Sequence, residues 1–160
     1  MNWFDSHCHL KGFKNKGNLE EILWRAEENG VSRMTAVGTS NDDWEIYKNL
    51  SEQYRDKIFY SVGLHPCYVN EGYESVIEKI ESYLGSGSPP VAIGELGLDY
   101  FHLPNNHNEA LSIIKNQKIA FLEQLKIAAH YNLPTIVHSR NAFSDCIAII
   151  EQSGLPWEKI

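Results

Sequence analysis

The segment DSHCHL, close to the start of the chain, holds residues that could bind a metal ion. Successive side chains of an extended strand alternate between two faces, so His7 and His9 lie on one face together with Asp5. Two imidazoles brought to one point are good ligands for zinc-like, manganese-like or iron-like ions. A His-x-His pair alone fits two ordinary polar residues at a strand edge equally well, so other segments must decide.

Three further apolar runs end in polar residues of the same kind. SVGLHP carries His65, VAIGE ends in Glu95, and IVHSR carries His138 and Arg140. A carboxylate directly after an apolar run is hard to explain by packing, because an uncompensated buried glutamate costs several kcal/mol. Histidine or glutamate at the same end of several strands therefore predicts one metal site rather than scattered surface polarity.

The periodicity of the apolar residues predicts the strands and helices that position these side chains. The expected strands cover residues 3–8, 33–38, 58–63, 91–95 and 134–138. The expected helices begin near Asn18, Asp42, Tyr73, Lys115 and Asn141, and residues 99–114 form a polar connection. Asn18 and Asp42 are the expected N-caps, because a glutamate follows each of them three residues later. Strict alternation of strand and helix predicts a parallel sheet with right-handed crossovers.

Two α/β architectures suit about five strand–helix units. A doubly wound open sheet would use all of them and would bind ligands beyond the carboxyl ends of its strands, at a switch point. A (β/α)8 TIM barrel needs eight units and typically about 250 residues, so this chain would supply only part of one. The order of elements alone favours the open sheet, whereas the chemistry at the strand ends favours the barrel.

Composition and charge exclude several classes of protein. With 160 residues, 42% apolar and 22% charged, the sequence is typical of one globular domain rather than a disordered or fibrous chain. No apolar run approaches the roughly 18 residues of a membrane helix, and the first residues lack a signal-peptide pattern, so we expect no membrane partner. Three cysteines without CxxC spacing favour a reducing, cytoplasmic location.

The net charge of -7 disfavours a large non-specific contact with duplex DNA. It does not exclude a phosphate ester as substrate, because bound divalent cations can reverse the local sign of the charge inside a cleft. Acidity therefore leaves a phosphodiester substrate possible and mildly favours a small one.

Taken together, the motifs resemble those of the TatD-related metal-dependent hydrolases. They are DSHCHL at 5–10, SVGLHP at 61–66, AIGELGLDY at 92–100, QKIAFLEQLKIA at 117–128 and VHSRNA at 137–142. Their order and spacing match across essentially the whole chain. The resemblance implies a TIM barrel of the amidohydrolase type, one or two divalent metal ions, and deoxyribonuclease or related phosphodiesterase activity on DNA or a small phosphodiester.

Carried over by this resemblance, His7 and His9 would bind the first metal ion, Glu95 would bridge two ions, and His138 would bind the second. Ligand types of this kind accept zinc, magnesium, manganese or iron, so the identity of the ion stays open. The mechanism implied is hydrolysis by a water molecule that the metal activates, with no side-chain nucleophile.

The same resemblance places His65 and Arg140 in the substrate site, beside the catalytic Glu95. A cationic or hydrogen-bonding side chain there can take a phosphate oxygen. We therefore expect these two residues to contact substrate rather than metal.

Two motifs of the resembling enzymes, an HCF-like segment with a further histidine and a TD-x-P segment with an aspartate, have no counterpart in this sequence. We therefore interpret residues 1–160 as a partial hydrolase barrel whose C-terminal units are missing. Glu95 and His138 alone would hold the second ion weakly. The unpaired strand edges would favour self-association or a completing polypeptide.

These departures keep two alternatives open. The first is a non-catalytic metal-binding or assembly fragment that lacks the late histidine and aspartate ligands. The second is hydrolysis of an amide or a lactone on the same scaffold, which would differ in what His65 and Arg140 contact.

The remaining polar candidates receive weaker interpretations. Alternation along its strand turns Cys8 away from the two neighbouring histidines, so we expect a buried thiol there. Asp99 fits both an acceptor that orients an imidazole and a turn-forming residue at the start of the polar connection. His102 and His107 are expected to be exposed, and His130 is expected to close a helix, where a cationic ring suits the helix dipole; none of the three receives a role.

Overall fold

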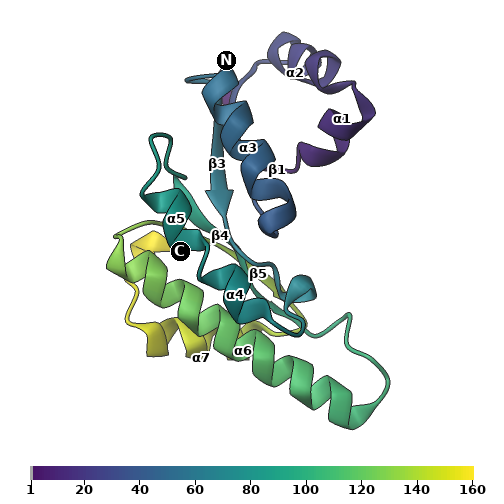
Figure 1. Cartoon of the computed structure of the whole chain (residues 1–160), viewed down its shortest axis with the longest axis vertical. Coiled ribbons are helices and arrows are strands. Elements are labelled where there is room, and N and C mark those ends of the chain that lie inside the picture. The colour runs from purple at the N-terminus through teal and green to yellow at the C-terminus, as the bar shows by residue number, and fades with distance from the viewer. Residues whose placement is uncertain (1) are drawn as a thin grey trace.

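The computed structural model describes residues 2–160 as alternating strands and helices. The strands are β1 (Trp3–Cys8), β2 (Val31–Ala36), β3 (Ile58–Val62), β4 (Ala92–Asp99) and β5 (Thr135–Arg140). The α-helices are α1 (Lys11–Lys16), α2 (Leu19–Glu28), α3 (Asn41–Gln53), α4 (Tyr73–Ile77), α5 (Ile80–Leu84), α6 (His107–His130) and α7 (Phe143–Ser153). Two 3-10 turns, η1 (Pro66–Tyr68) and η2 (Trp157–Lys159), complete the set (Figure 1).

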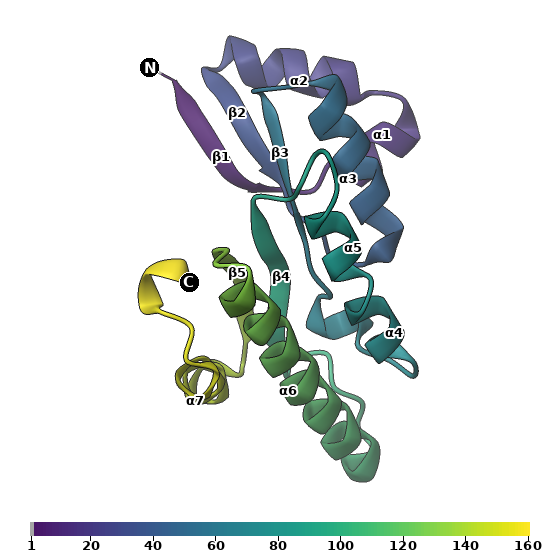
Figure 2. The ribbon, with the colours of Figure 1, turned by 60° about the vertical axis from the view of Figure 1, so that its left-hand side comes forward.

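The strands form one parallel, 5-stranded sheet in the order β1-β2-β3-β4-β5. Each strand neighbours the next one in the chain, which is the order of a barrel, whereas a doubly wound sheet reverses its order at a switch point. Figure 2 shows the sheet curling, with α2, α3, α5 and α4 along one side of β1 to β4. The doubly wound alternative is wrong, and the α/β fold is a curled, barrel-type sheet.

The core lies between the sheet and the helices that cover it. Trp44 and Tyr47 of α3 are at most 1% exposed, and the indole Nε1 of Trp44 donates a hydrogen bond to the carbonyl oxygen of Gly63 at 3.1 Å. Phe121 and Leu125 give α6 the corresponding apolar face against β4. No helix within residues 2–160 combines the length and the apolar character needed to cross a membrane.

Burial differs sharply between the middle and the edge of the sheet. All eight residues of β4 are buried, as is typical of a parallel strand covered on both faces. Five of the six residues of β1 are exposed, including Trp3 at 59% and Phe4 at 50%. Strands β1 and β5 are the two ends of the strand order, so each pairs on one side only within the part of the chain that the structure describes.

Several element boundaries differ from the predicted ones. Helix α6 begins at His107, eight residues before the expected start, because the side chain of Asn106 caps it by accepting a hydrogen bond from the backbone N–H of Glu109 at 3.1 Å. Strand β4 continues to Asp99, so the polar connection begins later than expected. The helix expected from Tyr73 to Leu84 is two short helices, and the short α1 was not predicted.

The two predicted capping boxes are also wrong in detail. Asn18 occupies the N-cap position of α2, but its side chain makes no capping hydrogen bond. The N-cap of α3 is Ser40 rather than Asp42. There the carboxylate of Asp43 accepts from the backbone N–H of Ser40, and the hydroxyl of Ser40 accepts from the backbone N–H of Asp42.

Two buried amides on one face of α6 fix the backbone near the strand ends. The Oε1 of Gln124 accepts from the backbone N–H of Leu64 at 2.7 Å, and its Nε2 donates to the carbonyl of Leu64 at 3.2 Å. The Oε1 of Gln117 accepts from the backbone N–H of Asp99 at 3.0 Å, and its Nε2 donates to the carbonyls of Asp99 and Pro66. Helix α6 therefore holds the segments on both sides of His65 and the end of β4.

We expect Gln124→Leu to lower the free energy of unfolding by about 2–4 kcal/mol, because it keeps the side-chain volume but leaves the buried N–H and C=O of Leu64 without partners. The measurement is a urea titration followed by circular dichroism. Lys126→Leu, on the exposed face of the same helix, is the control and should change stability by less than about 0.5 kcal/mol. Equal midpoints for the two variants would contradict this role of Gln124.

Candidate metal centre

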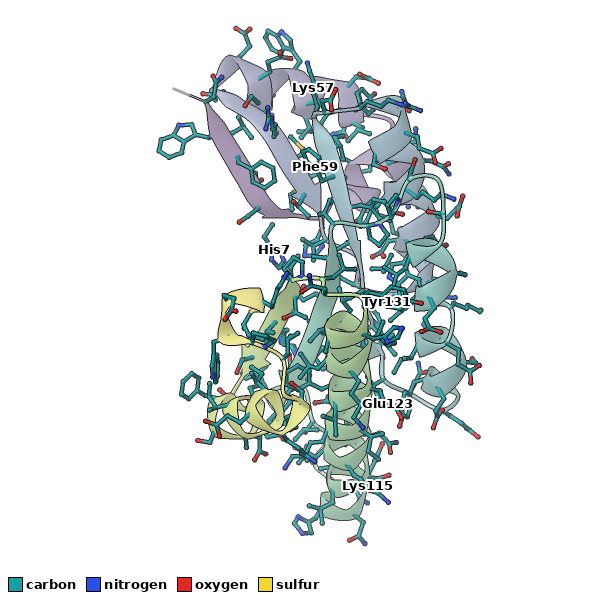
Figure 3. The ribbon with its side chains drawn as sticks, turned by 90° about the vertical axis from the view of Figure 1, so that its left-hand side faces the viewer. His7, Lys57, Phe59, Lys115, Glu123 and Tyr131 are labelled. Atoms are coloured by element: carbon teal, nitrogen blue, oxygen red, sulfur yellow. The ribbon has the colours of Figure 1, made fainter. Side chains whose placement is uncertain are left out.

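The predicted histidines gather around Glu95, which lies in the middle of β4 rather than at the predicted strand end, because β4 continues to Asp99. His7 lies on β1, Glu95 on β4 and His138 on β5, while His9 directly follows β1 and His65 lies three residues after the end of β3. Figure 3 shows His7 where the end of β1 meets the β4–β5 part of the sheet. Four strands thus deliver nitrogen and oxygen donors to one place, as the sequence predicts.

The carboxylate of Glu95 lies between two pairs of imidazoles. Its Oε2 is 3.4 Å from Nε2 of His7 and 3.8 Å from Nε2 of His9. Its Oε1 is 3.0 Å from Nδ1 of His138 and 3.8 Å from Nε2 of His65. Each pair together with Glu95 keeps its potential ligand atoms within 4.8 Å of one another. A carboxylate whose two oxygens face two separate sets of donors has the geometry of a bridging ligand.

A β-bulge aims the side chain of Glu95 into this cluster. Gly94 pairs with Ile136 and Leu96 pairs with Val137, so Glu95 is the extra residue on β4. Its backbone N–H leaves the ladder and donates to the carbonyl of Gly38 at 2.6 Å. Bulges of this kind turn one side chain out of the regular alternation, which here brings a carboxylate out of a fully buried strand.

Hydrogen bonds fix which nitrogen of each imidazole faces Glu95. The Nδ1 of His9 donates to the carbonyl of Val37 at 3.0 Å, which leaves its Nε2 as an unprotonated donor for a metal. The Nδ1 of His65 accepts from the backbone N–H of Cys67 at 3.1 Å, so its Nε2 carries the proton in the neutral ring. His9 therefore suits a metal ligand, whereas His65 suits a hydrogen-bond donor.

Burial and neighbouring charges shift the pKa values of His65, His138 and Glu95 in different directions. Burial, together with the neighbouring His138, lowers the pKa of His65 to about 4, so its ring is neutral near pH 7. The hydrogen bond to Glu95, and a second one to Asp99, raise the pKa of His138 above its ordinary value despite its burial. Burial acts to raise the pKa of Glu95, but the hydrogen bond with His138 and the nearby His65 and His7 bring it below its ordinary value.

Asp99 performs both of the functions that its sequence context suggests. Its Oδ1 accepts from the backbone N–H groups of Phe101 and His102, each at 3.0 Å, as in a turn-forming aspartate. Its Oδ2 accepts from Nε2 of His138 at 3.0 Å and thereby orients that imidazole. Although Asp99 is buried, its hydrogen bonds with His102 and His138 hold its pKa well below the ordinary value.

Arg140 and Cys8 lie outside the cluster around Glu95. The guanidinium of Arg140, at the end of β5, stacks on the ring of Phe101 with its Cζ 3.7 Å from the ring centroid. The thiol of Cys8 donates to the carbonyl of Thr35 at 3.3 Å, as expected of a side chain that strand alternation turns away from the histidines, but Cys8 is half-buried rather than buried.

Sequence reasoning missed four groups near the cluster. An open pocket of about 450 Å³ borders Glu95, His9 and His65, and its lining also includes Lys11 and Tyr68. Lys11 follows the His-x-His segment by two residues, a proximity that could have identified it.

The other missed groups are His102 and Cys67, which meet at Asp99. The spacing of three residues from Asp99 to His102, directly after a strand, was the signal available for His102. Burial and the neighbouring Asp99 raise the pKa of the Cys67 thiol to about 11.

Comparison with known proteins gives a consistent result. A family model described as TatD related DNase matches residues 4–158. The metal-dependent hydrolase YabD of Bacillus subtilis is 32% identical over 151 residues, which are 94% of this chain and 56% of that protein. A protein of Schizosaccharomyces pombe named Deoxyribonuclease Tat-D is 35% identical over 148 residues, which are 87% of this chain and 45% of that protein.

The fold also matches a solved structure. The crystal structure of YJJV, a TatD homologue from Escherichia coli K12, superposes with a TM-score of 0.82 at 28% identity and covers 96% of this chain. The match extends over 57% of the YJJV chain. The chain thus spans about half the length of the curated relatives it matches.

The close approach of β4 and β5 beside His138 requires a glycine at position 97. Gly97 has φ +141, and a Cβ there would overlap the carbonyl oxygen of His138. We expect Gly97→Ala to lower the free energy of unfolding by about 2–4 kcal/mol, measured by urea denaturation. Gly87→Ala is the control, because a Cβ at this exposed position meets nothing within 4 Å. If Gly97→Ala were as stable as Gly87→Ala, β4 and β5 could move apart without loss of stability, and position 97 would not require glycine.

Proposed function

The chain belongs to the TatD-related DNase family, and from this premise we propose that it carries the metal centre of a divalent-metal-dependent hydrolase that cleaves phosphodiester bonds in DNA. The observation that supports the proposal most directly is the position of Glu95. Its two carboxylate oxygens face two different pairs of histidines at distances of 3.0 to 3.8 Å.

The donors fit one or two divalent cations. His7, His9 and one oxygen of Glu95 form the first set, and the other oxygen of Glu95 with His138 forms the second. Imidazole and carboxylate together suit zinc, manganese, iron or magnesium. Asp99 accepts a hydrogen bond from Nε2 of His138, which leaves Nδ1 of that ring, 3.0 Å from Glu95, as the nitrogen for the ion. A bound divalent cation lowers the pKa of water and polarises a phosphoryl oxygen.

The residues around the centre supply contacts to a phosphodiester. The neutral ring of His65 offers its Nε2–H as a hydrogen-bond donor beside Glu95. Lys11 brings a positive charge to the same pocket, and the exposed Tyr68 brings an aromatic face on which a base can stack. Arg140, stacked on Phe101, adds a second positive charge at the end of β5. These cations favour a phosphate ester over an amide or a lactone.

Strand exposure supports the interpretation of residues 1–160 as part of a barrel. Both metal ligand sets come from strands in this chain, but β1 and β5 each pair on one side only within residues 2–160. We therefore propose that further strands, from a longer polypeptide or from a second copy, pair with these edges in the active protein. The alternative function is a non-catalytic metal-binding or assembly fragment.

We expect the chain to bind Mn²⁺ or Zn²⁺ and, once a second copy or a longer polypeptide pairs with its strand edges, to hydrolyse an end-labelled single-stranded DNA oligonucleotide, with activity lost on chelation and restored by added metal. Glu95→Gln should weaken metal binding at least tenfold, by isothermal titration calorimetry, because it removes the negative charge that both histidine pairs share. Glu151→Gln, on the exposed face of α7, is the matched control and should leave binding and hydrolysis unchanged.

Three outcomes separate the candidate functions. Unchanged metal binding in Glu95→Gln would contradict the bridging role. Normal metal binding without hydrolysis of DNA would support the non-catalytic alternative for this chain. Hydrolysis of an ester or amide test substrate, but not of DNA, would support the same scaffold acting on a different bond.

A separate prediction concerns Arg140. We expect Arg140→Ala to raise the KM for the oligonucleotide about tenfold with metal affinity unchanged, because one charge-assisted contact to phosphate is worth about 1.5–3 kcal/mol. Arg55→Ala, at an exposed position in the turn after α3, is the control and should leave KM unchanged. Equal KM values for Arg140→Ala and Arg55→Ala would show that Arg140 does not contact the substrate.

A further inference from the structure

A second group of potential ligands lies beside the centre around Glu95. Cys67 belongs to the turn η1, Asp99 is the last residue of β4, and His102 lies in the loop after it. The Sγ of Cys67 is 3.5 Å from Oδ2 of Asp99 and 3.7 Å from Nδ1 of His102, and those two atoms are 2.9 Å apart. Three atoms of different chemistry thus converge from two segments of the chain, the turn η1 and the end of β4 with the loop that follows it.

These separations fit one tetrahedral ion. Bonds of about 2.3 Å to sulfur and about 2.0–2.1 Å to nitrogen and oxygen place the ligand atoms of a tetrahedral zinc about 3.3–3.6 Å from one another. The observed distances of 3.5, 3.7 and 2.9 Å need adjustments of only a few tenths of an ångström. The same Cys67, Asp99 and His102 atoms fall within 4.8 Å of one another.

The arrangement does not suit a nucleophile–base–acid triad. In such a triad one ring nitrogen of the histidine faces the acid and the other faces the nucleophile. Here Nδ1 of His102 is the atom nearest to both Asp99 and Cys67. Convergence on one nitrogen is the geometry of shared coordination rather than of proton relay.

Hydrogen bonds orient the side chain of Asp99, and the group of Cys67, Asp99 and His102 is accessible from solvent. Two backbone N–H groups bind Oδ1 of Asp99 and hold the side chain, which is 1% exposed, with Oδ2 toward the cluster. Cys67 and His102 are exposed, so an ion can enter from solvent and keep water as a fourth ligand. Thiolate with imidazole selects zinc-type ions and disfavours magnesium and calcium.

We propose that Cys67, Asp99 and His102 bind a zinc-type divalent cation at a site distinct from the centre around Glu95. Binding replaces the proton of the Cys67 thiol, which is released to solvent, by a bond from sulfur to the ion; no electron is transferred. Asp99 links this site to the neighbouring centre, because its Oδ2 also accepts a hydrogen bond from Nε2 of His138.

Cobalt(II) absorption tests the proposal without any assay of hydrolysis. Titration of the full chain with Co²⁺ should produce a thiolate-to-cobalt charge-transfer band in the near ultraviolet, because the centre around Glu95 offers only nitrogen and oxygen donors. Cys67→Ser should abolish the band, and His102→Ala should weaken binding at least tenfold. Cys8→Ser should retain the band, since that thiol bonds to the carbonyl of Thr35.

The result is independent of the proposed function. Glu95→Gln should leave the band intact, so a failure of the hydrolase proposal and a failure of this one are distinguishable. A wild-type chain without the band, or a band that survives in Cys67→Ser, would overturn the site.

A second measurement avoids any substitution. The wild-type thiol of Cys67 is exposed, so an alkylating reagent can reach it, and mass spectrometry identifies the modified position. Its raised pKa keeps the reaction slow at neutral pH, so the rate is measured at mildly alkaline pH. Saturating Zn²⁺ should slow this reaction at least tenfold while leaving alkylation of Cys8 unchanged. An unaltered rate at Cys67 would also overturn the proposal.

Discussion

A carboxylate in a fully buried strand is the constraint on which the rest of this molecule depends. Glu95 is 8% exposed, and a charge so placed costs several kcal/mol unless partners compensate it. The compensation comes from His7, His9, His65 and His138, which reach Glu95 from three other strands. The bulge between Gly94 and Leu96 turns this side chain toward the four imidazoles, and at Gly97 the strand passes too close to the carbonyl of His138 for a Cβ.

The imidazole rings can face Glu95 only if the backbone segments that carry them are fixed in position. Helix α6 fixes two of these segments. Gln124 binds both backbone groups of Leu64, next to His65, and Gln117 binds both backbone groups of Asp99, which in turn orients His138. Buried amides with all their partners satisfied are rigid, because every movement leaves a polar group unpaired. Helix α6, which contributes no residue to the cluster around Glu95, thereby helps to position the rings of His65 and His138.

The difference between what the sequence predicts and what it misses has a physical cause. The sequence predicts that His7, Glu95 and His138 lie close together, because parallel strands place their carboxyl ends at one edge of a sheet. Strand alternation then predicts which face of the sheet each side chain occupies. Cys67 and His102 come from a turn and a loop, whose paths no periodicity describes. The early start of α6 was missed because Asn106 caps it by a single side-chain contact within a polar segment that has no apolar period.

The position of Glu95 also connects the proposed chemistry to the stability of the sheet. His7 lies on the exposed edge strand β1, whereas Glu95 lies on β4, and two strands separate them in the sheet order. An ion shared by these two residues would cross-link the exposed edge to the buried middle of the sheet, and binding free energy of this kind is also folding free energy. Occupancy of the metal centre and order in β1 are then coupled. Pairing of a further strand with β1 would reinforce both, because it would hold His7 where the ion needs it.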